Sequence, residues 1–579
     1  MTNFGNTAHS SRMARRSRRR LSGAVAALCA LSMVAAACGS DSDTDSAGST
    51  PAGDTAADGT TAATTGDSGS GGDARELIIA RDMDLQTLDP QRAYCDTCQI
   101  FLTAVYETLI GIDPNDPNVQ VPRLATDWVV NDDNTEFTFN LDPSAVFADG
   151  TPVTSADVKW SWERLANIEG PASYLMSGYT AIDTPDDQTV IITFENPNSA
   201  FLPIVSASYL GIVNSKVAEA DGGAIAAPGA VTDDQAEQWF LSNSAGSGPY
   251  TLTSYTDGDS LVLTRNENYW GATPATFPKV TMKQVQDSTA QLQQLQAGDV
   301  DIAMQISVDS MGQLEGDPNI VSATVNSYNY VYIALSPGAV GAEGLADNNV
   351  RQAIKLALDY DGILDVTVAG AGQKQASPIP NGFIGSADLA LPEQNLEEAK
   401  ALMAASDFPD GFTVNAMYPT VNVYGVDFDT MMQKVQQDLK EIGVELELQP
   451  VEFPQWIDQI NAEGIPVTAV YFAPDHTDSS QYVQYFGSVD GSSWATRAGG
   501  GDGGAPIIDP NENDLLAQAL AASGDAKTTL YTELGQSMMD ANIIVPLVNS
   551  QLVQAYAADI TNMHNSACCN LELNLLGLK

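Results

Sequence analysis

The segment from residue 412 to residue 472 alternates between two hydrophobic patterns. Apolar side chains first occupy every second position, as in a strand with one buried face, and then recur with helical spacing. The elements that these patterns predict are a strand at 412–418, a helix at 428–442 with Gly443 behind it, a strand at 444–448, a helix at 454–462 and a strand at 467–472. Units of this kind form a largely parallel sheet with covering helices.

The same alternation recurs in two other parts of the chain, whereas one region differs. A helix with Leu292 and Leu295 precedes a strand at 300–303, and a late helix precedes the apolar strand at 543–545. Residues 120–200 instead predict several strands separated by turns, such as the one at Asp149-Gly150. The predicted fold class is therefore α/β with a mixed, β-rich insertion.

The amino terminus has the pattern of an export signal. Six Arg lie within residues 12–20, and residues 21–37 are apolar or small. Because a membrane-spanning helix needs about 20 apolar residues, residues 1–37 are predicted to be a signal peptide. Cys38 follows small residues, as in the lipobox of bacterial lipoproteins, and this resemblance implies that its thiol is lipidated.

The alternative to a lipoprotein is an ordinary secreted protein that is cleaved near Ala37. Residues 17–21 resemble a twin-arginine signal, so either export route fits.

A tether is expected behind the lipidated cysteine. Residues 39–73 contain no aromatic residue, no Lys and no Arg, and consist mainly of Ser, Thr, Gly, Ala and Asp. Such a segment has too little apolar surface to offset the entropy of ordering. We expect 38–74 to be a flexible tether that reaches on average about 30–35 Å.

Length and charge restrict what the rest of the chain can be. Residues 74–579 exceed the size that one hydrophobic core supports, so at least two domains are expected. The formal charge is −49, and it becomes more negative once residues 1–37 are removed, because they carry six Arg and no acid. This balance argues against nucleic acid or an anionic membrane as the ligand. We interpret the acidic surface as adaptation to salty surroundings.

Four cysteines remain in the exported chain once Cys38 is lipidated. Cys95, Cys98, Cys568 and Cys569 are an even number in an oxidising compartment, which favours two disulfides. Cys95 with Cys98 is the local pairing, and cross-links to the 568–569 pair are the alternative. A zinc site is disfavoured because two of the cysteines are adjacent and few histidines are present.

The chain carries no catalytic or cofactor-binding signature. It has no GxSxG, no GxxxxGK[ST], no HExxH and no GxGxxG between a strand and a helix. His476 and His564 are the histidines of the exported chain, and neither has a recognisable partner Ser. Cys95-Asp96-Thr97-Cys98 could be a redox motif, but a structural disulfide is the preferred interpretation. We therefore expect no enzyme activity, no cofactor and no bound metal.

Several motifs resemble the extracytoplasmic solute-binding proteins of family 5, which serve ABC importers of oligopeptides, dipeptides and nickel. The strongest is VFADGTPVTSADV at residues 146–158. The others, in the order expected of the family, lie at 88–90, 105–109, 121–128, 137–141, 248–250, 265–271, 297–301 and 349–354. The resemblance covers most of residues 77–560.

This resemblance implies a two-lobed periplasmic-binding-protein fold with a hinge and a β-rich subdomain inserted in lobe I. The implied domains are 75–334 for lobe I, including its β-rich subdomain at 113–242, then 335–545 for lobe II, and 546–579 for the return to lobe I. The implied hinge lies near 330–336 and 545–549. Ligand contacts to both lobes exist only when the lobes are closed, so binding shifts the population toward that state.

The resemblance also assigns ligand-binding residues. In peptide-binding members an Asp pairs with the α-ammonium group of the ligand, and Asp475 matches it; the alternative is that it caps a turn. Phe472 matches a frequent aromatic residue, and His476 replaces a common Tyr or is merely solvated. Tyr94, Cys95 and Asp96 match a loop that runs beside the ligand. Asn549 stands in a segment where aromatic residues are frequent in the family.

The implied function is that of a binding lipoprotein rather than an enzyme. It captures a small solute, in the first place a peptide, and delivers it to the permease subunits of an ABC transporter. The lipid would hold it on the outer face of the cytoplasmic membrane. A sugar, an opine or a metal chelate would suit the same fold, and a secreted hydrolase or a sensory receptor are the alternatives from other classes.

Overall fold

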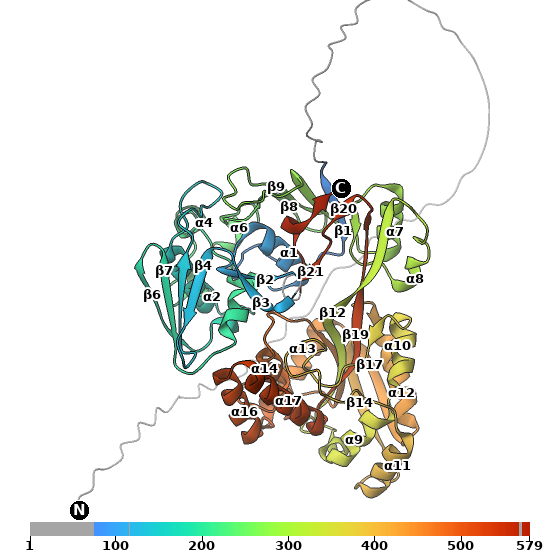
Figure 1. Ribbon diagram of the computed structural model, residues 1–579. Coiled ribbons are helices and arrows are strands. Elements are labelled where there is room, and N and C mark those ends of the chain that lie inside the picture. Colours follow the sequence, from blue (N-terminus) through green and yellow to red (C-terminus); the bar gives the residue numbers. More distant parts are fainter. Residues whose placement is uncertain (1–74, 115, 567–569) are drawn as a thin grey trace, which may run out of the picture. The chain divides into compact units, whose positions relative to one another are not determined.

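The computed structural model describes residues 75–114, 116–566 and 570–579 of the chain (Figure 1). The predicted signal peptide, the lipidation of Cys38 and the tether fall outside these residues. Cys568 and Cys569 fall outside them as well.

One mixed sheet of eleven strands runs through the described residues. Its order is β17-β14-β18-β12-β19-β11-β1-β10-β9-β8, with β13 paired to β19. The strands are β17 (Val444–Val451), β14 (Phe412–Pro419), β18 (Val467–Phe472), β12 (Ile320–Leu335), β19 (Ile544–Ala557), β11 (Ile302–Ala303), β1 (Leu77–Arg81), β10 (Lys279–Gln284), β9 (Ser260–Arg265), β8 (Tyr250–Thr256) and β13 (Gly372–Gln373). β14 is parallel to β17 and to β18, which confirms the arrangement predicted for 412–472. Because β12 is antiparallel to both of its neighbours, the sheet as a whole is mixed rather than largely parallel.

The half of the sheet around β14, β18 and β12 has a hydrophobic core on each face. Successive residues of a strand point to opposite faces, so Val331 and Ile333 of β12 pack in one core while Tyr330 and Tyr332 pack in the other. The first of these cores is covered by α9 (Asn348–Ala357), α10 (Tyr360–Val368), α11 (Leu396–Ala405) and α12 (Phe428–Lys440). The second is covered by α13 (Phe453–Ala462), α14 (Ser480–Phe486), α15 (Ser493–Ala498), α16 (Pro510–Ala521) and α17 (Gly524–Ala541). We call the residues around these two cores lobe II.

A third large core belongs to the amino-terminal half of the chain, and we call the residues around it lobe I. A separate antiparallel sheet of order β4-β5-β7-β6 contributes to it, which agrees with the β-rich pattern of residues 120–200. Its strands are β4 (Ala125–Val130), β5 (Glu136–Leu141), β6 (Tyr179–Asp186) and β7 (Thr189–Phe194). Other elements of lobe I are α1 (Asp96–Val105), β2 (Ile110–Asp113), β3 (Asp116–Pro122), α2 (Ser155–Ile168), η1 (Ser173–Met176), α3 (Phe201–Val205) and α4 (Ser215–Gly222). A smaller neighbouring core is formed with α7 (Ser288–Ala297) and α8 (Val308–Met311).

Helix α2 begins with a capping box. Thr154 is the N-cap residue, and its backbone N–H donates to the Asp157 carboxylate at 3.0 Å. This contact satisfies one of the polar groups that the first turn of a helix leaves without an intrahelical partner.

The long strands β12 and β19 connect the lobes. Val545 and Val548 of β19 pack in lobe II, whereas Val553 and Ala555 pack beside β1 and α7. The pairing of β12 with β19 shifts register between Asn326 and Tyr330, where the strands pass from one set of contacts to the other. Leu571 and Leu573 pack in the core of lobe I, so the segment after β19 returns to that lobe.

Candidate ligand-binding site

A buried polar loop joins β18 to α14. Its residues from Pro474 to Ser479 are all buried. Gln481 of α14 ties the loop together: its Oε1 accepts from the Asp475 backbone N–H at 2.9 Å, and its Nε2 donates to the Asp478 carbonyl at 3.1 Å. Because buried backbone groups need partners, this one side chain fixes the shape of the loop that carries the predicted ligand residues.

Asp475 lies where the lobes meet. Its side-chain oxygen Oδ2 accepts hydrogen bonds from the hydroxyl groups of Tyr94, at 2.7 Å, and Tyr174. Both tyrosines belong to lobe I, in the loop before α1 and in η1, whereas Asp475 belongs to lobe II. The other oxygen, Oδ1, takes no hydrogen bond from any residue that the structure describes, and Asp475 has no ion pair there.

Asp475 differs in this respect from other buried acids without a cation. Glu107, Asp157 and Glu512 also lack an ion-pair partner in the described ranges, but each accepts hydrogen bonds on both oxygens. Burial is the main cause that raises the pKa of Asp475 to about 6, and the two tyrosine hydroxyls partly offset it. Among the residues that the structure describes, the site therefore holds a desolvated carboxylate without a cation.

Asp478, three residues further along the same loop, is fully satisfied. Lys527 of α17 pairs with its Oδ2 at 2.6 Å, and Oδ1 accepts from the Tyr531 hydroxyl at 2.7 Å and from the Ser480 backbone N–H at 2.9 Å. Although burial alone would raise the pKa of Asp478, Lys527 and the Ser480 backbone N–H lower it to about 2. This ion pair anchors the loop to α17.

His476 is buried between these two acids and is 1% exposed. Burial lowers its pKa to about 4, so the ring is neutral near pH 7. Its Nδ1 accepts from the Asp478 backbone N–H at 3.2 Å. In this structure the ring supports the loop, and its role toward a ligand stays a prediction.

The segment Tyr94-Cys95-Asp96 faces this loop from lobe I. Tyr94 reaches Asp475 and packs its ring 5.3 Å from that of Tyr209. Cys95 is the N-cap of α1 and is bonded to Cys98 in a disulfide. Burial raises the pKa of Asp96, and its side chain lies 3.9 Å from Arg81. The first turn of α1 thus holds Tyr94 in place.

Aromatic rings line the lobe II side of the site. Phe472 is half-buried and packs on Tyr485 and Phe486, with ring centroids 4.9 and 5.0 Å apart. Burial also raises the pKa of Tyr471 and Tyr424, which stand near Asp96. Phe472 also packs 5.6 Å from the ring of Tyr482, whose pKa is raised by burial and by the nearby Asp475, so this aromatic cluster reaches the carboxylate.

Asn549 takes a different position from the other predicted residues. Its side-chain Nδ2 donates to the carbonyl oxygens of Ser327 and Asn329, each at 3.1 Å. These contacts bridge the register shift between β12 and β19. The structure therefore places Asn549 in the strands that connect the lobes, while Phe472, His476 and Tyr94 gather around Asp475.

Three contributors to the site were missed from the sequence. Tyr174, Gln481 and Lys527 bind Asp475 or its loop, yet they lie in a short η1 turn and on two helices of unremarkable pattern. No spacing rule links Tyr174 to a residue 301 positions away. The one signal in the sequence is that each is a polar residue in a segment where about half of the residues are apolar.

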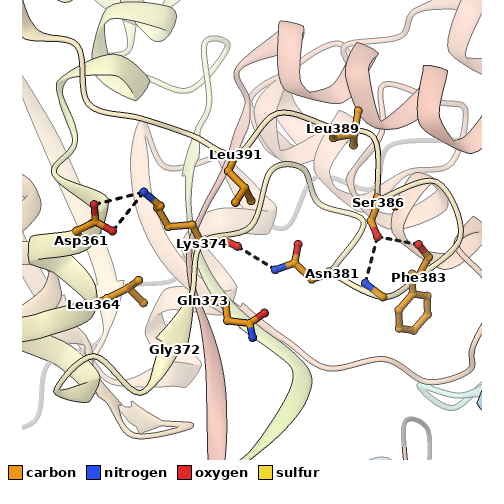
Figure 2. A pocket seen from close by; sticks show the side chains of 12 residues that line it. Asp361, Leu364, Gly372, Gln373, Lys374, Asn381, Phe383, Ser386, Leu389 and Leu391 are labelled. Carbon is orange, nitrogen blue, oxygen red and sulfur yellow. Dashed lines mark hydrogen bonds and ion pairs between the residues drawn. The ribbon is translucent and has the colours of Figure 1, made fainter.

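A separate cavity lies in lobe II, away from Asp475 (Figure 2). It has a volume of about 710 Å³ and is lined by residues between Asp361 and Leu391. Lys374 on its wall is already paired with Asp361 at 3.2 Å, and Asn381 donates to the Lys374 carbonyl at 2.9 Å. Since its polar groups satisfy one another, this cavity is a weaker candidate than the loop around Asp475.

Within the described residues, no cluster of three or more His, Cys, Asp and Glu side chains is placed to hold a metal ion. None of the helices in that part of the chain combines the length and the apolarity that a membrane crossing requires.

The chain is similar to known binding proteins over most of its length. The family model "Bacterial extracellular solute-binding proteins, family 5 Middle" matches residues 119–494. The probable D,D-dipeptide-binding periplasmic protein DdpA of Escherichia coli K12 is 28% identical over 469 residues, which are 80% of this chain and 86% of that protein.

Solved structures share the fold at lower identity. The Helicobacter pylori periplasmic binding protein DppA, in complex with the peptide STSA, has a TM-score of 0.72 at 19% identity and covers 87% of this chain and 98% of its own. The binding protein AgaA of A. tumefaciens R10, in complex with agropinic acid, has a TM-score of 0.70 at 22% identity and covers 87% and 99%. The predicted two-lobed periplasmic-binding-protein fold is thereby confirmed.

Proposed function

This chain belongs to family 5 of the bacterial extracellular solute-binding proteins, and we propose that it captures a peptide through its α-ammonium group. The observation that carries the proposal is the buried, unpaired carboxylate of Asp475 at the meeting of the lobes. An isolated buried charge is costly, and the cost falls sharply when an opposite charge pairs with it. A ligand ammonium at the open Oδ1 supplies that charge.

The surroundings of Asp475 suit the rest of a peptide. Charge-assisted hydrogen bonds are the stronger kind, so the ammonium group fixes one end of the ligand. The rings of Phe472 and Tyr485 offer an apolar surface for side chains, with little demand on their identity. The D,D-dipeptide and peptide binders among the similar proteins support the same ligand class.

Delivery to a membrane importer completes the proposed function. The carboxylate belongs to lobe II and its hydroxyl donors to lobe I, so a ligand at Asp475 is held only when the lobes meet. Binding then shifts the population toward the closed form, which the permease subunits of an ABC transporter distinguish from the open one. Lipidation of Cys38 would keep this carrier on the outer face of the cytoplasmic membrane.

Calorimetry with peptides tests the ligand class. The native protein should bind a free peptide at least about a hundredfold more tightly than its N-acetylated form, which is about 3 kcal/mol. Asp475→Asn keeps the shape, removes the charge and should abolish this preference. Asp490→Asn, which changes an exposed carboxylate of lobe II, is the matched control and should keep it.

Equal affinity of the native protein for free and acetylated peptides would refute the ammonium assignment. Mass spectrometry of the ligand that co-purifies with the protein separates the remaining classes: a sugar, an opine or a metal chelate in place of a peptide would overturn the proposal while leaving the family intact.

The lipid anchor has its own test. Cys38→Ser should release the protein from membranes into the medium, because the thiol that carries the lipid is lost. A mutant that stays on membranes after a high-salt wash would contradict the anchor and leave the ligand proposal untouched.

A further inference from the structure

A second set of contacts joins the lobes, apart from Asp475. It lies where α16 ends and α17 begins, and its lobe I side is formed by the turn before β5 and the segment before α3. Asn134 and Ser199 are the lobe I residues, and they are themselves connected because the Asn198 backbone N–H donates to the Asn134 carbonyl at 2.8 Å. We call this set, with Leu520, Ala521 and Lys527 of lobe II, the α16 latch.

Lobe I supplies the hydrogen bonds that the end of α16 lacks. The last carbonyl groups of a helix have no intrahelical donor and need partners from outside. The Ser199 backbone N–H donates to the Leu520 carbonyl at 2.8 Å, its hydroxyl donates to the Ala519 carbonyl at 3.3 Å, and the Asn134 side-chain Nδ2 donates to the Ala521 carbonyl at 3.1 Å. Three successive carbonyls of a lobe II helix thus accept hydrogen bonds from lobe I. Two of them, those of Leu520 and Ala521, have no other donor among the residues that the structure describes, whereas the Ala519 carbonyl also accepts from the Ala522 backbone N–H at 3.2 Å.

An apolar contact accompanies these hydrogen bonds. Leu520 belongs to lobe II by sequence, yet its side chain packs against the core of lobe I. The neighbouring Leu516 and Leu515 of the same helix pack instead against the core of lobe II. Separation of the lobes would expose Leu520 to water, which costs free energy in proportion to the apolar area exposed.

Lys527 connects the latch to the ligand-binding loop. Its Nζ donates to the Ser199 carbonyl at 3.3 Å and pairs with Asp478 at 2.6 Å. Asp478 lies in the same buried loop as Asp475, and Gln481 holds the two residues together. One side chain therefore contacts both the lobe I segment and the loop that carries the unpaired carboxylate.

We propose that the α16 latch is a ligand-independent clasp that keeps the lobes together in the empty protein. The contacts involve only groups of this chain, so the closed form is populated before a ligand arrives. A ligand that needs the closed form then binds with an apparent dissociation constant equal to the intrinsic one divided by the closed fraction. The latch determines that fraction. Lys527 connects the latch to the loop around Asp475, because it contacts both Ser199 and Asp478.

Hydrogen exchange of the empty protein tests the clasp without reference to any ligand. The Ser199 amide should be protected in the native protein because its N–H is bonded across the lobes. In the double variant Asn134→Gly/Leu520→Ala, the peptide that contains Ser199 should exchange at least tenfold faster, while peptides within β5 and β7 should be unchanged. The radius of gyration from X-ray scattering should rise in the same variant.

The variants are chosen so that the fold survives. Asn134 has a φ of 55°, a conformation that glycine adopts readily, so Asn134→Gly alone remains informative if Leu520→Ala reduces stability. Leu516→Ala is the matched control, because it removes the same atoms from the same helix but from the lobe II side. Unchanged exchange at Ser199 in the double variant, or an equal increase in Leu516→Ala, would overturn the proposal; neither result depends on the peptide ligand.

Discussion

Asp475 and Asp478 lie three residues apart in one buried loop, yet their electrostatic situations are opposite. Asp478 is matched by Lys527 and accepts on both oxygens, and its pKa falls to about 2. Asp475 has neutral donors on one oxygen, and its pKa rises to about 6. Burial acts on both acids, so the presence or absence of a cation decides the difference.

The comparison separates a carboxylate with a structural role from the one that we propose to bind the ligand. A buried ion pair with satisfied hydrogen bonds holds a loop in one shape, and its removal is destabilising. An unpaired buried carboxylate reduces stability and is retained where a ligand completes it. The loop thus uses Asp478 to fix the geometry in which Asp475 remains unpaired.

Removal of the cation from Asp478 should have the largest effect. Lys527→Met keeps the apolar stem but leaves Asp478 buried without its partner, so the free energy of unfolding of lobe II should fall by about 3–5 kcal/mol in urea titrations. Lys440→Met, which disrupts a pair that is 70% and 61% exposed, is the control and should cost less than about 1 kcal/mol. Adding Asp478→Asn to Lys527→Met should recover part of the loss; a loss under 1 kcal/mol in Lys527→Met would contradict the structural role.

Neutralisation of Asp475 should act in the opposite direction on stability. Folding raises the pKa of Asp475 to about 6, so the folded state is favoured while this carboxyl is protonated. This stabilisation is fully present below about pH 4 and is lost as the pH rises through about 6. Asp475→Asn should therefore raise the free energy of unfolding of the empty protein by about 1–3 kcal/mol at pH 7.5. The two proteins should be equally stable near pH 4. Melting curves of both proteins at the two pH values check this, and a destabilised Asn variant at pH 7.5 would show that Asp475 already has a counter-charge.

The pH dependence of peptide affinity should report the same carboxylate. Below about pH 6 the empty site takes up a proton that the ligand ammonium must displace, so affinity should fall about tenfold for each further pH unit. Calorimetry from pH 7.5 to pH 4.5 measures it. Asp475→Asn should show no such slope, and a slope of equal steepness in that variant would assign the titration to another group.

The tyrosine hydroxyls should produce the smallest change. Tyr94→Phe or Tyr174→Phe removes one donor to Asp475, which favours its protonated form by about 0.5–1.5 kcal/mol. The midpoint of the affinity–pH curve should therefore move upward by about 0.4–1 pH unit. Tyr209→Phe is the control, since its hydroxyl group lies near the charge of Asp475 but hydrogen-bonds to Gln99 instead of to that carboxylate. Equal midpoints in Tyr94→Phe, Tyr174→Phe and native protein would show that these contacts do not tune the acid.

The two sets of contacts between the lobes differ in what they require. The tyrosine contacts are made to a titratable group that we propose pairs with a ligand. The α16 latch instead caps carbonyl groups and buries Leu520. The first set therefore depends on pH near 6, and the second does not. Hydrogen exchange at Ser199, measured at pH 5 and pH 7.5 and corrected for the intrinsic rates, distinguishes the two sets of contacts: protection by the latch should be the same at both pH values.

The sequence by itself determined the elements and the family. The alternation over 412–472 located three strands and two helices within a few residues of their observed bounds, because periodicity reflects which face of each element is buried. The motifs around 146–158 identified the fold, and the position of Asp475 after a strand followed from the same resemblance.

Only the tertiary structure decided which groups meet. Tyr174 reaches Asp475 from 301 residues away, and Lys527 reaches Asp478 from 49. Local patterns record burial and turn chemistry, but they contain no information on which distant segments the sheet and the crossing strands bring together. The contrast between a paired and an unpaired carboxylate in one loop depends on those distant partners, so it could not be read from residues 475–478 alone.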